Sequence, residues 1–315
     1  MRKLLLFCCS IVFVLSSCSN GKRAKRTDTP TSGVAELVGD DCFAKIIQEE
    51  IDVFEGINRE AYLLPRYENE VEAVNLLLKD SVRLAVLARD LTDAEKQGIR
   101  ERNIQLVPRS QKIAIDGIAL IINKENTDSL ISIPTLKKIT TGEITSWKEI
   151  NKDSKLDKMT VVFDNPNSST VRFIIDSICG DKPLYEGLNA QNNNQEVLDY
   201  VAKTPNALGI IGVNWISNPN DTSNLTFNNK IRVMMVSRND PATIDNSYPP
   251  LAAFLALGDY PLRRDIYVVL TDLRGTLLSG FVRFLADDRG QRIIMKSGLL
   301  PATRPIRLIT IKEEF

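Results

Sequence analysis

The 315-residue sequence contains no histidine, and this absence removes several classes of function at once. Ser-His and Cys-His nucleophilic pairs and the HExxH zinc motif all require histidine. A zinc site with four cysteine and histidine ligands is excluded for the same reason. A hydrolase with Cys42 or Ser168 as nucleophile would need a lysine or carboxylate base. We therefore expect no enzymatic activity, no metal and no cofactor.

The sequence also lacks the features of a nucleic-acid-binding protein. Its 40 lysines and arginines are balanced by 40 aspartates and glutamates. It has no basic stripe with interleaved aromatic residues, no internal repeat and no low-complexity segment. The length suffices for one large domain or for two lobes. We expect a monomer that does not bind nucleic acid.

The first residues have the pattern of an export signal. Arg2 and Lys3 precede an apolar run over 4–15, which is too short to cross a bilayer as a mature helix. The run ends in Leu-Ser-Ser before Cys18, which resembles a bacterial lipobox. This resemblance implies a signal peptide over 1–17 and a lipid on Cys18, which would anchor the protein to the membrane. The alternative is an ordinary signal peptide. Residues 18–33 are polar and predict a flexible tether.

The remaining chain alternates short apolar strands with amphipathic helices. This alternation indicates an α/β fold with a largely parallel sheet. The predicted strands are 34–38, 61–65, 82–87, 113–123, 159–163, 208–213, 231–236 and 266–270.

Ligands of such sheets bind beyond the C-terminal ends of the strands. The loops that follow the first three predicted strands, 39–43, 66–70 and 87–90, are therefore expected to face one region. Asp40 or Asp41 is predicted to cap the first helix, and Thr92 to begin a capping box.

The stretch 159–179 is predicted to form a strand, a tight polar loop and a helix. The helix is predicted to bury one face that carries Val171, Ile174, Ile175 and Ile178, which recur with helical period. Ser168, Ser169 and Thr170 lie where this helix begins. The free N–H groups and positive dipole end of a helix start favour a small anion. The alternative is that Ser168 only caps the helix.

These motifs, in this order, resemble the phosphate-binding proteins of bacterial ABC uptake systems over about residues 34–301. The resemblance implies a two-lobed periplasmic-binding-protein fold of the type II kind. Each lobe would be a mixed, mostly parallel sheet flanked by helices, with the ligand between the lobes. The first lobe would comprise 34–117 and 268–315, and the second 118–267. The matching segments are 39–43, 91–93, 113–123, 142–144 with Trp147, 167–170, 209–212 and 260–262.

The same resemblance implies a ligand site. Cys42 and Phe43 stand where the family has a hydroxyl residue and a phenylalanine, and Arg89 falls in a loop that often carries Ser-Arg. Residues 168–170 stand at the family's Ser-Gly-Thr segment. The implied ligand-binding residues are Cys42, Phe43, Tyr67, Glu68, Arg89, Asn167, Ser168, Ser169, Thr170 and Arg172. Because Cys42 and Cys179 would lie far apart, we expect them to be unpaired.

Several residues depart from the family pattern. Asp164 replaces the arginine that usually precedes the Ser-Gly-Thr segment, and Glu68 and Glu70 replace small residues of the second loop. Carboxylates repel a dianion unless they accept its protons in hydrogen bonds or pair with arginine. The candidates for the missing positive charge are Arg66, Arg89 and Arg172.

The sequence thus predicts a lipid-anchored, extracytoplasmic solute-binding protein of the bacterial cell envelope, facing the periplasm or the cell exterior. It would capture phosphate or a related oxyanion for an ABC permease. One alternative is a solute with an amine or several hydroxyls, which an unpaired Glu68 or Glu70 in the cleft would favour. Another is a signalling or envelope-interaction protein, which an empty cleft that does not close would favour.

Overall fold

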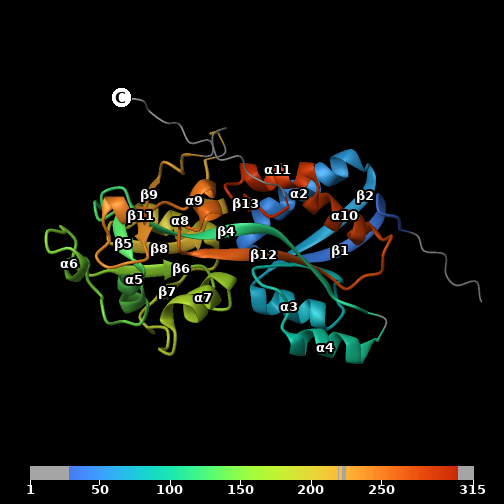
Figure 1. Cartoon of the computed structure of the whole chain (residues 1–315), viewed down its shortest axis with the longest axis horizontal. Helices are drawn as coiled ribbons and strands as arrows, with labels where there is room; N and C mark the ends of the chain where they lie inside the picture. Colours follow the sequence, from blue (N-terminus) through green and yellow to red (C-terminus); the bar gives the residue numbers. More distant parts are fainter. Residues whose placement is uncertain (1–27, 105, 219, 222–224, 304–315) are drawn as a thin grey trace, which may run out of the picture.

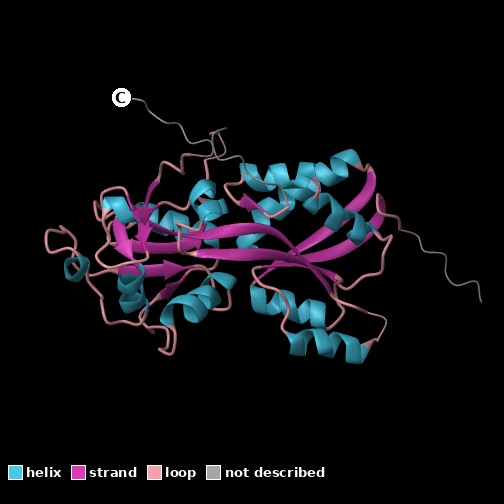
Figure 2. Ribbon diagram, viewed as in Figure 1, coloured by secondary structure: helices cyan, strands magenta, loops and turns pink. Residues whose placement is uncertain are grey.

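A ten-stranded mixed sheet runs the length of the molecule, with helices on both faces (Figures 1 and 2). The computed structural model describes residues 28–104, 106–218, 220–221 and 225–303, so Cys18 and the predicted signal peptide lie outside the described residues. The strands are β1 (Ser32–Asp40), β2 (Glu60–Glu68), β3 (Leu84–Leu87), β4 (Arg109–Asn123), β6 (Thr160–Phe163), β7 (Asn189–Ala190), β8 (Ala207–Gly212), β9 (Ile231–Val233), β12 (Arg263–Leu270) and β13 (Leu300–Pro301).

The strand order is β2-β1-β3-β12-β4-β8-β6-β7, with β9 and β13 each paired to β4. Strands β2, β1 and β3 are parallel, and so are β8, β6 and β7. The antiparallel pairs of this sheet all involve β4 or β12. Each end of the sheet is therefore a parallel α/β unit, as predicted, and two antiparallel strands join the ends.

Strands β4 and β12 run from one half of the molecule to the other (Figure 1). They pair Asp116 with Arg264 and Gly117 with Arg263. We use the predicted boundaries, 34–117 with 268–315 and 118–267, to name the first and second lobes. Both lobes therefore share these two strands.

Amphipathic helices cover both faces of the sheet in each lobe. In the first lobe, α2 (Ala44–Ile57), α10 (Leu277–Ala286) and α11 (Asp288–Lys296) lie on one face, and α3 (Glu70–Leu78) and α4 (Asp93–Arg102) on the other (Figure 1). In the second lobe, α8 (Asn194–Lys203) lies opposite α5 (Ile133–Thr140) and α7 (Ser169–Ile174). Phe54 of α2 packs edge-on against Phe281 of α10, with ring centroids 5.3 Å apart.

The second lobe carries smaller elements at its outer end. These are the helix α6 (Trp147–Ile150) and a sheet of β5 (Leu130–Ser132), β10 (Met235–Ser237) and β11 (Ser247–Tyr248). The helix α9 (Ala252–Leu257) lies nearer the crossing strands, against β4 and β13. Trp147 is fully buried in this lobe. No helix among the described residues is both long and apolar enough to cross a membrane.

Several local predictions were wrong. The predicted strand 231–236 is two strands, β9 and β10, which belong to different sheets. The second strand continues through Tyr67 and Glu68, because β2 pairs with β1 along its whole length and Glu68 lies opposite Asp40. The helical pattern of residues 71–78 predicts that Val71 is buried together with Val74 and Leu77. Val71 is 53% exposed, because α3 buries Ala73, Val74 and Leu77 instead. Ile175 is 40% exposed, because α7 changes into a π-helical turn at Ile175–Cys179.

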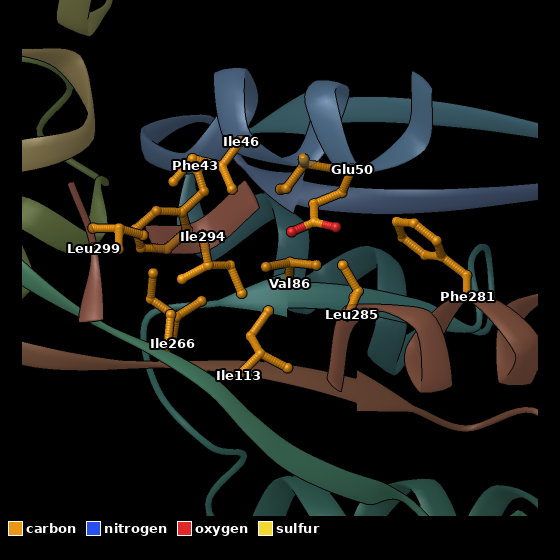
Figure 3. Close-up of a pocket in the computed structure, with 12 residues that line it drawn as sticks. Phe43, Ile46, Glu50, Val86, Ile113, Ile266, Phe281, Leu285, Ile294 and Leu299 are labelled. Carbon is orange, nitrogen blue, oxygen red and sulfur yellow. The ribbon is translucent and has the colours of Figure 1, made fainter. Parts of the chain in front are cut away.

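The core of the first lobe contains a cavity of about 20 Å³, room for about one water (Figure 3). Apolar side chains of α2, α10, α11 and the neighbouring strands line it, together with Glu50. Glu50 is 1% exposed, and neither of its carboxyl oxygens has a hydrogen-bond partner among the described residues. Burial, with a smaller contribution from Glu49, raises the pKa of Glu50 to about 9. This cavity is too small and too apolar to hold an oxyanion.

Candidate functional site

Polar side chains from both lobes meet where the crossing strands pass, and most of them are fully buried. We call this group the junction cluster. It comprises Asp40, Asp41, Cys42, Asp116, Asp164, Ser168, Ser169, Thr170, Asn194, Asn214 and Arg264. Asp40 ends β1 and Asp164 directly follows β6, so the cluster lies at the C-terminal ends of these strands, as predicted.

The first lobe contributes the turn between β1 and α2. The Asp40 carboxylate accepts a hydrogen bond from the Cys42 backbone N–H at 3.0 Å and so caps the 3-10 turn Asp41–Phe43. The Cys42 carbonyl accepts hydrogen bonds from Asn214 Nδ2 at 2.9 Å and Trp215 Nε1 at 2.7 Å. Side chains of the second lobe thus hold this turn in place.

The second lobe contributes the loop between β6 and α7. Ser168 Oγ accepts a hydrogen bond from the Val171 N–H at 3.2 Å, so Ser168 is the N-cap of α7. The same hydroxyl donates to Asp164 Oδ1 at 2.6 Å. The capping role of Ser168 is confirmed, and its hydroxyl hydrogen is used within the protein. Ser169 and Thr170 follow it and are fully buried.

Cys42 lies between the lobes and contacts the second lobe through its thiol. Sγ donates to Asp164 Oδ2 at 3.2 Å and lies 3.4 Å from Thr170 Oγ1 and 3.5 Å from Ser169 Oγ. Burial, followed by the charges of Asp164 and Asp40, raises the pKa of the thiol well above its usual value. The sulfur is therefore a protonated donor at neutral pH.

Arg264 supplies the buried positive charge of the cluster. Its Nε and Nη2 lie 3.0 and 2.9 Å from Asp116 Oδ2, and its Nη1 donates to Ser169 Oγ at 2.8 Å. The guanidinium also lies over the Phe43 ring, 4.9 Å from its centroid. Burial alone would lower the pKa of Arg264, but the carboxylate of Asp116 raises it, so the side chain stays charged.

Sequence reasoning missed Arg264, Asn194 and Asn214. The sequence contained one indication that a buried positive charge such as Arg264 was needed. Asp116 interrupts the apolar run 113–123, and a buried carboxylate requires a partner. Burial does raise the pKa of Asp116, and the Arg264 guanidinium opposes this shift.

Acidic groups outnumber basic groups in the cluster. Burial raises the pKa of Asp41 to about 8, and the charges of Asp40 and Asp164 add to this effect. Oxygens of Asp40 and Asp41 and the sulfur of Cys42 lie within 4.8 Å of one another, a spacing that a cation could bridge. Because the pKa values of Asp41 and Cys42 are raised, a cation bound here would have to displace their protons.

The other predicted site residues lie outside the cluster. Tyr67 donates its hydroxyl to Gln48 at 2.9 Å, and Asn167 is exposed. Glu68 lies 3.4 Å from Arg66, so the nearest positive charge to this carboxylate is a neighbour on its own strand. The predicted residues that the structure brings together are Cys42, Phe43, Ser168, Ser169 and Thr170.

Arg172 and Arg89 converge on Glu70 instead of facing the cluster. Arg172 of the second lobe binds the nearly buried Glu70 of the first lobe with Nε and, at 3.0 Å, with Nη2. Arg89 lies 3.5 Å from Glu70 and binds both carboxylate oxygens of Glu95 at 2.8 Å. Glu68 and Glu70 thus both have arginine partners. Neither is the unpaired carboxylate that would favour a solute with an amine or several hydroxyls.

We expect Arg172→Ala to shift the balance between closed and open lobes toward the open form. The Arg172–Glu70 pair crosses the junction, and a partly exposed pair of this kind contributes about 1 kcal/mol. Small-angle X-ray scattering should show a larger radius of gyration. Asp176→Ala is the matched control, because it removes the exposed helical partner of Arg172 and leaves the interlobe pair intact. Equal radii for the two variants would contradict the prediction.

Cys42 and Cys179 are free and buried, which confirms that they are unpaired.

We expect both thiols to resist a disulfide reagent in the folded protein, because the thiolate is the reactive species and neither sulfur is accessible. Cys42 lies between the lobes, so it should react whenever they separate, whereas Cys179 should react only on unfolding. Rates measured in Cys42→Ser and Cys179→Ser variants test this. Equal rates for the two thiols would show that the lobes do not separate.

Comparisons with known proteins agree with this architecture. A family model for the PBP superfamily domain matches residues 24–289. A Staphylococcus aureus protein named phosphate-binding protein PstS is 22% identical over 284 residues, which cover 88% of this chain and 81% of the relative.

Solved structures show the same fold. A putative phosphate ABC transporter substrate-binding protein from Clostridium perfringens, with bound phosphate, superposes with a TM-score of 0.71 at 20% identity, covering 86% of this chain and all of that chain (100%). An ABC-type phosphate transport receptor from Vibrio cholerae superposes with a TM-score of 0.63 at 19% identity. The match covers 84% of this chain and 99% of the receptor. The family match spans most of the sequence, and the chain therefore belongs to the PBP superfamily.

Proposed function

We propose that the protein is a lipid-anchored, extracytoplasmic solute-binding protein that captures phosphate or a related oxyanion and delivers it to an ABC permease. The observation that carries this proposal is the junction cluster, where a buried guanidinium and the hydroxyls of Ser169 and Thr170 meet the Cys42 thiol between two lobes. The names of the relatives from Staphylococcus, Clostridium and Vibrio support the choice of phosphate.

Binding at this place requires the lobes to separate. The Cys42 sulfur lies 3.2 to 3.8 Å from its hydrogen-bond partners in the second lobe, so the two lobes are in direct contact here. An oxyanion held between two donors adds a hydrogen bond on each side, so the donors must lie at least about 5 Å apart. Hinge motion about the crossing strands β4 and β12 would provide this space.

The predicted lipoprotein signal supports the location. Cleavage before Cys18 and lipid on its sulfur would hold the protein at the membrane, and the polar residues between Cys18 and β1 would give the lobes reach toward a permease. The predicted tether 18–33 is too long at its end, because Ser32 and Gly33 belong to β1 and pair with β2. Binding and transfer of the solute would need no covalent chemistry, and this role requires no histidine.

Calorimetric titration with phosphate tests the proposal. The mature chain with Cys18→Ser is unfolded, washed and refolded to remove carried-over ligand. We expect saturable binding with a dissociation constant of about 1 μM or tighter. Ser169→Ala should weaken binding about tenfold, because its hydroxyl accepts the hydrogen bond from Arg264 Nη1 that positions the buried guanidinium. Ser177→Ala, an exposed serine in the same helical segment, is the control. No heat of binding from the refolded protein at millimolar phosphate would overturn the assignment.

A further inference from the structure

Asp164 makes the contacts that a bound oxyanion would make. Its Oδ1 accepts a hydrogen bond from Ser168 Oγ at 2.6 Å. Its Oδ2 accepts hydrogen bonds from Cys42 Sγ and from Asn194 Nδ2, both at 3.2 Å. A carboxylate, like an oxyanion, offers only acceptor oxygens, and here three neutral donors from three separate elements converge on it.

The position of Asp164 is unusual for a carboxylate. It is fully buried, and no lysine or arginine forms an ion pair with it among the described residues. The charge of Asp164 instead acts on Asp41, another carboxyl group, in the turn after β1. The buried guanidinium of Arg264 is directed to Asp116 and to Ser169 instead. Hydrogen bonds, one of them from the opposite lobe, therefore stabilise this charge.

We propose that Asp164 is an internal anion of the site. When the lobes close without ligand, its carboxylate accepts the hydrogen bonds of Ser168, Cys42 and Asn194. An oxyanion must compete with the carboxylate for these donors. This inference rests on the proposed function, because it concerns the same site. Asp164 would be a determinant of affinity and specificity, since it repels external anions and occupies their hydrogen-bond donors at the same time.

Two consequences follow from this arrangement. The Cys42–Asp164 hydrogen bond crosses the junction, so Asp164 stabilises a closed form that contains no oxyanion. An entering anion can accept hydrogen bonds from Ser168, Cys42 and Asn194 only after the hydrogen bonds of these donors to Asp164 break. Neutralising Asp164 should therefore increase affinity for oxyanions, which is the opposite of what removing a ligand-binding residue would do.

Calorimetric titration of Asp164→Asn with phosphate and with sulfate tests the inference. The variant keeps the shape of the side chain and removes its charge. Asp176→Asn is the matched control, because it removes the same charge from an exposed position twelve residues further along the same segment. We expect Asp164→Asn to bind phosphate or sulfate at least about tenfold more tightly than wild type, and Asp176→Asn to match wild type within about twofold.

The outcomes separate this inference from the proposed function. If wild type binds phosphate and Asp164→Asn binds equally or more weakly, the inference is wrong and the proposed function stands. If wild type does not bind but Asp164→Asn does, the inference stands and phosphate capture by the natural protein is wrong. If neither wild type nor Asp164→Asn binds phosphate or sulfate, the inference and the proposed function are both wrong. Asp164→Ala, checked for cooperative thermal unfolding, must give the same direction of change as Asp164→Asn, and the opposite direction would overturn the inference.

Discussion

Replacing Arg264 by methionine is expected to lower the free energy of unfolding by about 3 to 5 kcal/mol and to abolish oxyanion binding. The Arg264 side chain is 3% exposed and makes two contacts to the fully buried Asp116. Removing the guanidinium leaves that carboxylate without its charge partner, which is the situation that destabilises buried ion pairs most. Urea unfolding at pH 7 measures the loss of stability, and calorimetry measures the loss of binding.

A double variant shows whether the unpaired carboxylate is the cause. Asp116→Asn added to Arg264→Met removes the isolated charge and should recover part of the lost stability. Arg264→Lys should be intermediate, because an ammonium group keeps the charge but not the planar fork that reaches both Asp116 and Ser169. If the double variant is no more stable than Arg264→Met, the loss comes from packing against Phe43 and not from the charge.

Replacing Glu50 by glutamine is expected to stabilise the protein by about 3 kcal/mol at pH 7. The pKa of Glu50 is raised from 4.5 in the unfolded chain to about 9 in the folded one. Between these values the folded state holds a proton that the unfolded state releases. Stability therefore falls by about 1.4 kcal/mol per pH unit as the pH rises through this window. Glutamine is neutral throughout and removes this contribution to the slope.

Urea unfolding at pH 5, 7 and 8.5 measures this difference. The advantage of Glu50→Gln over wild type should be small at pH 5 and should grow at each higher pH. Glu36→Gln on β1 is the matched control, because it changes the same charge at an exposed position outside the cavity. Parallel stability curves for wild type and Glu50→Gln would show that Glu50 is ionised in the folded protein.

The strands and capped helices could be predicted because their signals are local. The capping box of Thr92 and Glu95 is present with both of its hydrogen bonds. Ser168 caps α7, and Asp40 caps the 3-10 turn that precedes α2. Burial of apolar residues and satisfaction of free N–H groups act over a few residues, so the sequence pattern suffices to place them.

The site could be predicted only in part, because half of it is assembled over long distances in the chain. Ser168, Ser169 and Thr170 were found because they follow a strand and begin a helix. Cys42 lies in a loop that also follows a strand, and the family resemblance implied its role. Arg264 is 148 residues from Asp116, and only the pairing of β12 with β4 brings them together. Arg172 was expected to bind the ligand, but its partner Glu70 belongs to the other lobe, and no sequence pattern connects the two.

The two crossing strands also determine how the chain can be divided. β4 is a single strand of 15 residues, and it pairs with β12 and β13 at one end and with β8 and β9 at the other. A fragment cut out at residues 118–267 would begin and end in the middle of β4 and β12. Each lobe expressed alone would expose broken strand edges and invite aggregation. The lobes are therefore not interchangeable modules, and chimaeras between relatives should exchange helices and loops while keeping β4 and β12 from one parent.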